Sequence, residues 1–177
     1  MIIRPISRDV FATDKLRPQF LLSEVKSRMA SIGMTMPKQK VAISIVNRAE
    51  FDRLLKRHSN AVTGLTVTHS GYLGTDHHIY MLNGMSTCRY KETLAHECGH
   101  VWLNDRHSVL NQHSRQEVEG FCNLVAFKVL MFDKSQDAAW VRQCMLNNPD
   151  PIYGEGFRIM KQRAEQMGWR NMLAAYS

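Results

Sequence analysis

The sequence has few cysteines and no long apolar run, and each of these scarcities excludes a class of protein. Its four cysteines form no C-x-x-C pair and are too sparse for a disulfide scaffold in a chain of 177 residues, so we expect reduced thiols. The longest apolar candidate, residues 124–132, is interrupted by Lys128 and falls short of the roughly 18 residues that a membrane span needs. No apolar run typical of a secretion signal follows the first basic residues. We therefore expect a soluble cytoplasmic protein that has no membrane partner.

Acidic residues are also scarce relative to basic ones, with 16 Asp and Glu against 23 Lys and Arg, a net charge of +7. The excess lies in residues 1–60, which hold 12 basic and 5 acidic residues, whereas residues 61–177 hold 11 of each. A short predicted helix over residues 50–58 carries part of it: Arg53, Lys56, Arg57 and His58. A solvated face is the simplest interpretation, and the sharper hypothesis is a surface that docks an acidic substrate or partner. We rank nucleic acid behind such a partner.

The length is typical of one domain, and a hydrophobic share of 44% is enough for a core, so we expect a single α+β domain over residues 1–177. Hydrophobic periodicity predicts a small mixed sheet with helices in the first part and only helices from residue 87 onward. The predicted elements are a helix from residue 13 or 14 to Gly33, a strand over 41–45, a helix over 50–58, strands over 64–69 and 78–83, and helices over 89–104, 115–133, 136–147 and 156–167.

The clearest motif is His96-Glu97-Cys98-Gly99-His100, within the helix predicted over residues 89–104. Two histidines four residues apart project from the same face of an α-helix, so both imidazoles can bind one metal ion with Glu97 beside them. The motif thus predicts two ligands of a zinc site. The simpler alternative is an ordinary helix with two satisfied core histidines.

A catalytic zinc usually takes three protein ligands and leaves one position open for water. The third ligand of a metzincin is excluded, because that pattern needs Gly at position 103 and His at position 106, where this chain has Leu103 and Arg106. An SprT-like site would need a histidine soon after His100, and His107 has no helical register with it. A glutamate on the following helix remains.

Glu117 and Glu119 are both placed to be that ligand, and residues two apart point to different sides of a helix. Ser114 and Glu117 match a capping box, which gives Glu117 a structural role at the start of the helix. Asn123 follows Glu119 by one turn, and its polar side chain can hold a ligand histidine or the ligand carboxylate in place by a hydrogen bond. We therefore favour Glu119 as the ligand and keep Glu117 as the alternative.

Three separated segments resemble a known family. These are His96-Glu97-Cys98-Gly99-His100-Val101-Trp102-Leu103, Glu117-Val118-Glu119-Gly120-Phe121-Cys122 and Pro151-Ile152-Tyr153-Gly154-Glu155-Gly156-Phe157-Arg158. Together they resemble the C-terminal peptidase domain of plant LIM-domain, ubiquitin-activated growth-regulating peptidases and their stand-alone bacterial relatives. The resemblance covers about residues 64–173 and implies a zincin-like fold of the gluzincin type, one Zn²⁺ per chain and endopeptidase activity. No LIM or ubiquitin-interacting segment is present, so ubiquitin activation is not implied.

This reading predicts a zinc metallopeptidase acting on a protein or peptide. Zinc lowers the pKa of bound water from about 15.7 to about 7, and Glu97 would act as general base and then as acid toward the leaving amine. Tyr153 is our candidate donor to the charged intermediate, with His107 and His113 as alternatives. The strand over residues 78–83 is predicted to be an edge strand that pairs with the substrate backbone. The rival functions are a non-catalytic zinc-stabilised binding module and a basic nucleic-acid-associated protease.

Overall fold

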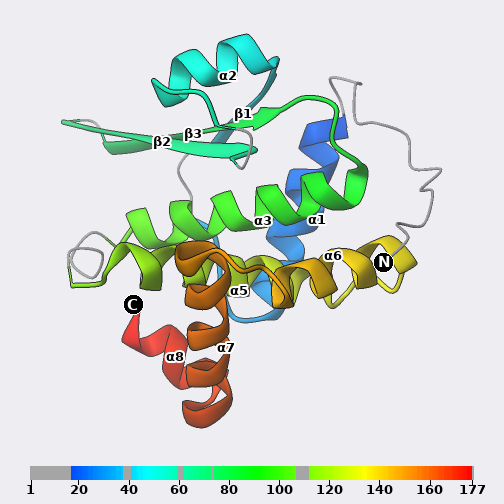
Figure 1. Ribbon diagram of the computed structural model, residues 1–177. Coiled ribbons are helices and arrows are strands. Elements are labelled where there is room, and N and C mark those ends of the chain that lie inside the picture. The colour runs from blue at the N-terminus through cyan, green and yellow to red at the C-terminus, as the bar shows by residue number, and fades with distance from the viewer. Residues whose placement is uncertain (1–16, 38–40, 60–61, 73, 107–111, 177) are drawn as a thin grey trace.

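The computed structural model describes residues 17–37, 41–59, 62–72, 74–106 and 112–176 (Figure 1). Over these residues the chain has seven α-helices and a three-stranded mixed sheet, which confirms the α+β prediction. The elements are α1 (Arg17–Ser31), β1 (Val41–Val46), α2 (Arg48–Leu55), β2 (Gly64–Gly71), β3 (Gly74–Leu82), α3 (Thr87–Asn104), α5 (Arg115–Leu130), α6 (Gln136–Leu146), the π-helical turn η1 (Pro151–Glu155), α7 (Gly156–Met167) and α8 (Trp169–Ala175). The predicted order of helices and strands is confirmed, and the expected helix start at residue 13 or 14 lies outside the described residues.

Local capping explains where four of the helices begin. The side chains of Asn47, Ser86, Ser114 and Ser135 each accept a hydrogen bond from a backbone N–H in the first turn of α2, α3, α5 and α6. Such caps satisfy N–H groups that have no partner within the helix. At Ser114 both hydrogen bonds of the predicted capping box are present.

The strand order is β1-β3-β2, with β1 parallel and β2 antiparallel to β3. The prediction that residues 78–83 form an edge strand is therefore wrong, because β3 is the central strand. The β2–β3 hairpin occupies one side of β3, and the chain passes from β1 through α2 so that β1 pairs with the other side. Alternation of apolar residues shows which side chains share a face of the sheet, but it does not show which strands lie next to one another. Strand β2 is left at the edge.

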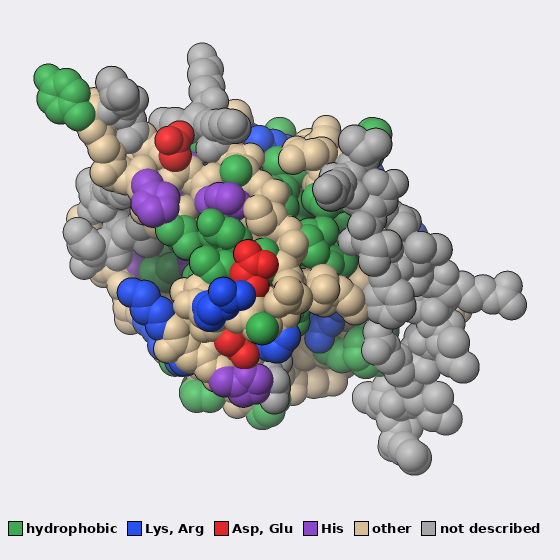
Figure 2. Space-filling view, turned by 90° about the horizontal axis from the view of Figure 1, so that it is seen from above, with side chains coloured by type: hydrophobic (Ala, Val, Ile, Leu, Met, Phe, Trp, Pro, Cys, Tyr) green, Lys and Arg blue, Asp and Glu red, His purple; other side chains and the backbone are tan. Residues whose placement is uncertain are grey.

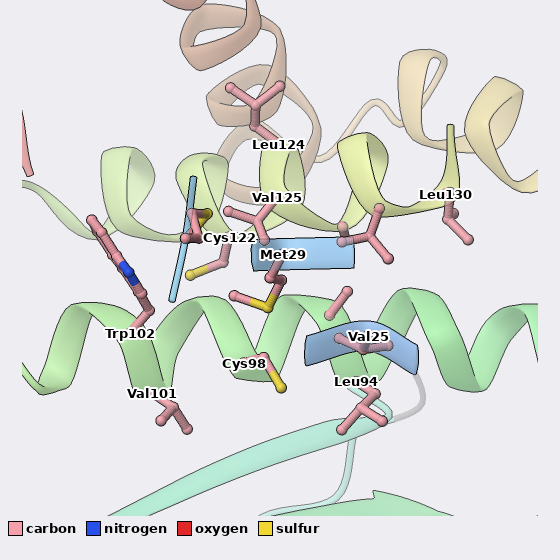
Figure 3. Packing of buried hydrophobic residues seen from close by; sticks show 14 of the residues in the cluster. Val25, Met29, Leu94, Cys98, Val101, Trp102, Cys122, Leu124, Val125 and Leu130 are labelled. Atoms are coloured by element: carbon pink, nitrogen blue, oxygen red, sulfur yellow. The ribbon is translucent and has the colours of Figure 1, made fainter. Parts of the chain in front are cut away.

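The sheet lies between α2 on one face and α3 on the other, and α5 packs along the opposite side of α3 (Figure 1). The core fills the space where α1, α3 and α5 meet, with Met29, Leu94 and Val125 among its residues (Figure 3). Cys98 and Cys122 lie in this core, as expected of small buried hydrophobes. Burial raises the pKa of the Cys98 thiol to about 12, which keeps it protonated and unreactive.

Two segments depart from the predicted pattern. Helix α2 ends at Leu55 because Lys56 adopts a left-handed conformation, with φ 55°, so the basic residues after it lie beyond the helix end. On the side of the molecule where α2 lies, basic and acidic side chains are interspersed (Figure 2). Helix α8 was not predicted, and it docks through Trp169, whose indole N–H donates to the carbonyl of Ile32 over 2.7 Å.

No helix among the described residues is long and apolar enough to cross a membrane.

Candidate metal centre

The side chains of His96, His100 and Glu119 converge on one point. The Nε2 atoms of the two histidines are 3.1 Å apart, and Oε2 of Glu119 lies 3.2 Å from His96 and 3.3 Å from His100. Ligand atoms held about 2.0 Å from a tetrahedral zinc ion stand about 3.3 Å from one another. The triangle therefore has the size that zinc requires. Within the described part of the chain, no other three His, Cys, Asp or Glu side chains form such a group.

Two packed helices supply these ligands. Residues 96 and 100 are one turn apart on α3, and Glu119 faces them from the second turn of α5. The close approach of the helices depends on Gly99, because a Cβ at that position would lie 3.1 Å from Sγ and 3.2 Å from Cα of Cys122. Glycine in the variable pair of the motif thus lets α5 bring its carboxylate within reach of both imidazoles.

Asn123 determines which nitrogen of His96 is free to bind a metal. Its amide nitrogen donates to the main-chain carbonyl of Tyr153 over 2.8 Å, so its oxygen must face His96. That oxygen is 2.8 Å from Nδ1 of His96, which therefore carries the proton and donates. The lone pair of His96 is then on Nε2, directed at the two other ligand atoms. The sequence-based placement of Asn123 behind the site agrees with this contact.

Glu119 is held as a carboxylate. Its burial alone would raise its pKa, but the adjacent imidazoles of His100 and His96 outweigh that cost and hold the pKa well below its usual range. Burial likewise opposes protonation of His96, while the adjacent carboxylate of Glu119 raises the pKa of the imidazole. A buried anion between two imidazoles is the donor set of a divalent transition metal such as zinc. The residues present thus fit a zinc ion.

Glu117 points away from this group. Its carboxylate caps α5 through Ser114 and accepts from the guanidinium of Arg163 over 2.6 Å. Those hydrogen bonds, that of Arg163 first, lower the pKa of Glu117. Of the two candidate glutamates, the structure therefore brings only Glu119 to the histidines.

Glu97 is a residue of α3 and is 5% exposed, and its side chain lies against the edge strand β2. The hydroxyl of Thr66 lies 2.6 Å from Oε2 of Glu97 and 3.2 Å from its main-chain oxygen. Gly64 leaves space for the other carboxylate oxygen, because a Cβ there would lie 2.5 Å from Oε1. Two residues of β2 thus set the position of this carboxylate.

Tyr153 reaches the site from η1, with its ring centroid 6.3 Å from that of His96. Arg115, the first residue of α5, lies beside its side chain, and this contact raises the pKa of the guanidinium. Burial raises the pKa of Tyr153 and Glu119 adds to the effect, while Arg115 opposes them. Of the alternative donors, His113 stacks on Tyr176 at 4.2 Å and does not line the site, and His107 lies outside the described residues.

These groups line a cleft of about 470 Å³ between β2, α3 and the start of α5. One wall is the free edge of β2, which in the described residues pairs with β3 alone. The candidate metal ligands His96, His100 and Glu119, together with Glu97, lie on the wall that α3 and α5 form. We call these three ligands the triad. The cleft is therefore open beside a strand whose backbone groups are available for pairing.

Thr66 and Arg115 were missed by the sequence analysis. Thr66 lies 31 residues before Glu97, and only the packing of β2 on α3 brings them together. Arg115 follows the cap residue of α5. Its position offers one signal, since Glu119, the predicted third ligand, lies four residues further along the same helix.

Comparison of the chain with protein-family models, with curated proteins and with solved structures finds no match.

Proposed function

We propose that this protein is a zinc-dependent peptidase of the gluzincin type, with His96, His100 and Glu119 as zinc ligands and Glu97 as general base. The observation that carries the proposal is the triangle of ligand atoms, 3.1–3.3 Å on each side, at the wall of an open cleft. A structural zinc site is usually closed by a fourth protein ligand, whereas three ligands facing a cleft are typical of a catalytic site.

Zinc bound in such a site acts as a Lewis acid that activates water and polarises the scissile carbonyl. Glu97 follows the first ligand in the motif and presents its carboxylate to the same cleft. It accepts the proton of the attacking water and returns a proton to the amine that leaves. Thr66 and Gly64 hold the carboxylate in one position for both proton transfers.

The free edge of β2 supports binding of an extended peptide. Residues 62–66 line the cleft opposite the triad, and backbone pairing with an edge strand is a common way to hold a peptide. Pairing with the substrate backbone was expected of residues 78–83. We assign it to β2 instead, because β3 is paired on both sides.

Tyr153 is our candidate donor to the oxygen that becomes negative during hydrolysis. The guanidinium of Arg115 lies beside the side chain of Tyr153 and offsets part of the rise in its pKa that burial and Glu119 cause. All four cysteines are free thiols, which supports a reducing, cytoplasmic compartment.

The test is metal analysis combined with a Glu97→Gln substitution. We expect about one zinc per purified chain, loss of peptide cleavage on chelation, and recovery on adding zinc. Glu97→Gln should retain the metal and reduce cleavage by at least 10³-fold. A wild-type protein that binds no zinc, or a variant that cleaves normally, contradicts the proposal. Zinc binding without cleavage of any peptide would favour the non-catalytic binding module.

A further inference from the structure

A second cavity, of about 540 Å³, adjoins the metal cleft. Four residues line both spaces: Arg89, Glu92, Asn123 and Tyr153. The second space is bounded by α6 and the segment that follows it, and we call it the α6 pocket. Nothing in the mechanism above uses it.

The lining of the α6 pocket is apolar at depth and polar at the rim. Met145 and Phe157 are buried, and Trp140 is half-buried. The ionisable groups at the boundary with the cleft are Arg89 and Glu92, which form an ion pair and offset each other's charge. A charged side chain entering the pocket would therefore lose hydration without gaining a counter-charge, whereas an apolar one gains contact area.

The pocket begins one side-chain layer from the metal site. Asn123 hydrogen-bonds to both His96 and the main chain of Tyr153, and it lines the cleft and the pocket alike. Tyr153 also lines both spaces, and its ring centroid lies 6.3 Å from that of His96. A peptide whose scissile bond lies at His96 thus has an adjacent side chain within reach of the pocket.

We propose that the α6 pocket binds an aromatic or long aliphatic side chain of the substrate residue next to the scissile bond, and so determines cleavage preference. This inference rests on the peptidase function proposed above. The size of the pocket is within the range of small-molecule sites, so a phenylalanine or leucine side chain enters without rearrangement of the buried floor.

Cys144 provides a chemical probe, because it lines the pocket and is half-buried. The other three cysteines are buried, and burial raises the pKa of Cys88 and of Cys98 to about 12 and that of Cys122 well above its usual value. Benzyl methanethiosulfonate should therefore react at Cys144. The thiolate sulfur attacks the sulfenyl sulfur, methanesulfinate leaves, and a benzyl mixed disulfide fills the pocket. The methyl reagent is the size control, and Cys144→Ser is the control that lacks the thiol.

The first measurement uses a peptide library and the zinc-loaded protein. We expect enrichment of Phe, Tyr, Leu or Met at one position flanking the cut. Benzyl modification should lower kcat/KM for a Phe-containing peptide by at least 10-fold and change that of the matched Ala peptide by less than 2-fold. The methyl reagent should change neither, and a phosphine reductant should restore the preference. A flat profile, or a preference that survives benzylation, overturns the proposal.

The second measurement does not need catalysis. In zinc-loaded Glu97→Gln protein, N-acetylphenylalanine amide at millimolar concentration should slow alkylation of Cys144 by iodoacetamide at least 3-fold, and N-acetylalanine amide should not. Protection without any cleavage of peptides supports the pocket and rejects the peptidase function. Equal alkylation rates with both amides reject the pocket even where cleavage is found.

Discussion

At the scale of single residues, Thr66 has the most direct contact with the proposed general base. Its hydroxyl has one proton and lies near two acceptors of Glu97, the Oε2 atom at 2.6 Å and the main-chain oxygen at 3.2 Å. The shorter contact takes the proton and fixes the carboxylate rotamer. Thr66 lines the cleft through β2, but its hydroxyl acts on the reaction through the carboxylate of Glu97, so we treat it as a positioning residue.

Thr66→Val should therefore lower kcat by about 10-fold, equivalent to about 1.4 kcal/mol of transition-state stabilisation. KM and zinc content should change little, because valine keeps the volume and the ligands are untouched. Thr66→Ser restores the donor and should recover activity to within about 2-fold. Steady-state kinetics with zinc analysis on both variants measures this. A valine variant with normal kcat would show that Glu97 keeps its orientation without Thr66.

Residue-level prediction worked where a role depends on neighbours along the chain. The spacing of His96 and His100 predicted their shared face, and the capping box separated Glu117 from Glu119, because both patterns are set within one or two helical turns. Thr66 could not be found in this way, since a hydroxyl on a strand and a carboxylate on a helix have no fixed relation in sequence.

At the scale of helices and strands, a close contact between α5 and the start of α7 keeps Glu119 and Tyr153 in one site. A Cβ at Gly120 would overlap the main chain of Gly156, and a Cβ at Gly156 would lie 2.5 Å from the carbonyl oxygen of Gln116. The turn η1 precedes this contact and carries Tyr153. Both glycines are therefore required by the distance between the helices.

Gly120→Ala should destabilise the protein by up to about 2 kcal/mol. Overpacking of backbone costs about 1–3 kcal/mol, and the better helix propensity of alanine offsets about 1 kcal/mol of it. Gly71→Ala is the matched control, because nothing lies within 4 Å of a Cβ there, and its stability should change by less than about 0.5 kcal/mol. Urea unfolding of both variants makes the comparison. Equal stabilities would mean that α7 moves away without cost.

Lys91 on α3 connects three elements, with its Nζ 3.1 Å from Glu24 of α1 and 3.2 Å from Asp133 after α5. Burial opposes ionisation of Asp133, but hydrogen bonds from Ser135 and Lys91 outweigh it and lower the pKa of the carboxyl. A depressed folded-state pKa stabilises the protein above the unfolded value of about 3.9. That contribution disappears as the pH falls through the folded-state pKa.

Asp133→Asn should consequently lower the free energy of unfolding by about 1 kcal/mol at pH 7 and by almost nothing once the pH is below the folded-state pKa of Asp133. Unfolding of the metal-free protein across this range isolates the carboxyl from zinc release. The exposed Asp76→Asn serves as control and should show a small, pH-independent difference. A difference for Asp133→Asn that persists at low pH would assign the effect to packing.

At the same scale, the sequence predicted which segments are strands but misassigned their neighbours. The period of two in residues 78–83 is the same for a central and an edge strand with one polar face, and only the path of the chain from β1 through α2 places β3 in the middle. Helix α8 escaped prediction because seven residues are too few for a clear helical period.

At the scale of the whole molecule, the excess positive charge of residues 1–60 includes exposed groups near the end of α2. Arg53, Lys56 and Arg57 are exposed, whereas Arg48 and His58 are paired with Asp52. Arg57 and Leu55 also line the metal cleft. The basic surface is therefore continuous with one end of the proposed active site.

Replacing Arg53 and Lys56 by Glu should weaken cleavage of a peptide with a distal run of glutamates by about 3- to 10-fold, mainly through KM. The same peptide with glutamines in the run should be unaffected, and the difference should shrink as salt screens the charges. Lys134→Glu with Arg170→Glu changes the net charge equally at exposed positions outside the cleft and provides the control. Equal losses in both double variants would remove the docking hypothesis.

The amide of Asn123 joins His96, a proposed metal ligand, to the turn that carries Tyr153, and this has a thermodynamic consequence. Binding equilibria that share a movable element are linked, and the linkage is reciprocal. Any ligand that shifts the Pro151–Glu155 turn changes the affinity for zinc by the same factor by which zinc changes the affinity for that ligand. Zinc titrations with and without N-acetylphenylalanine amide would measure this coupling free energy. Titrations of the amide with and without zinc should give the same value.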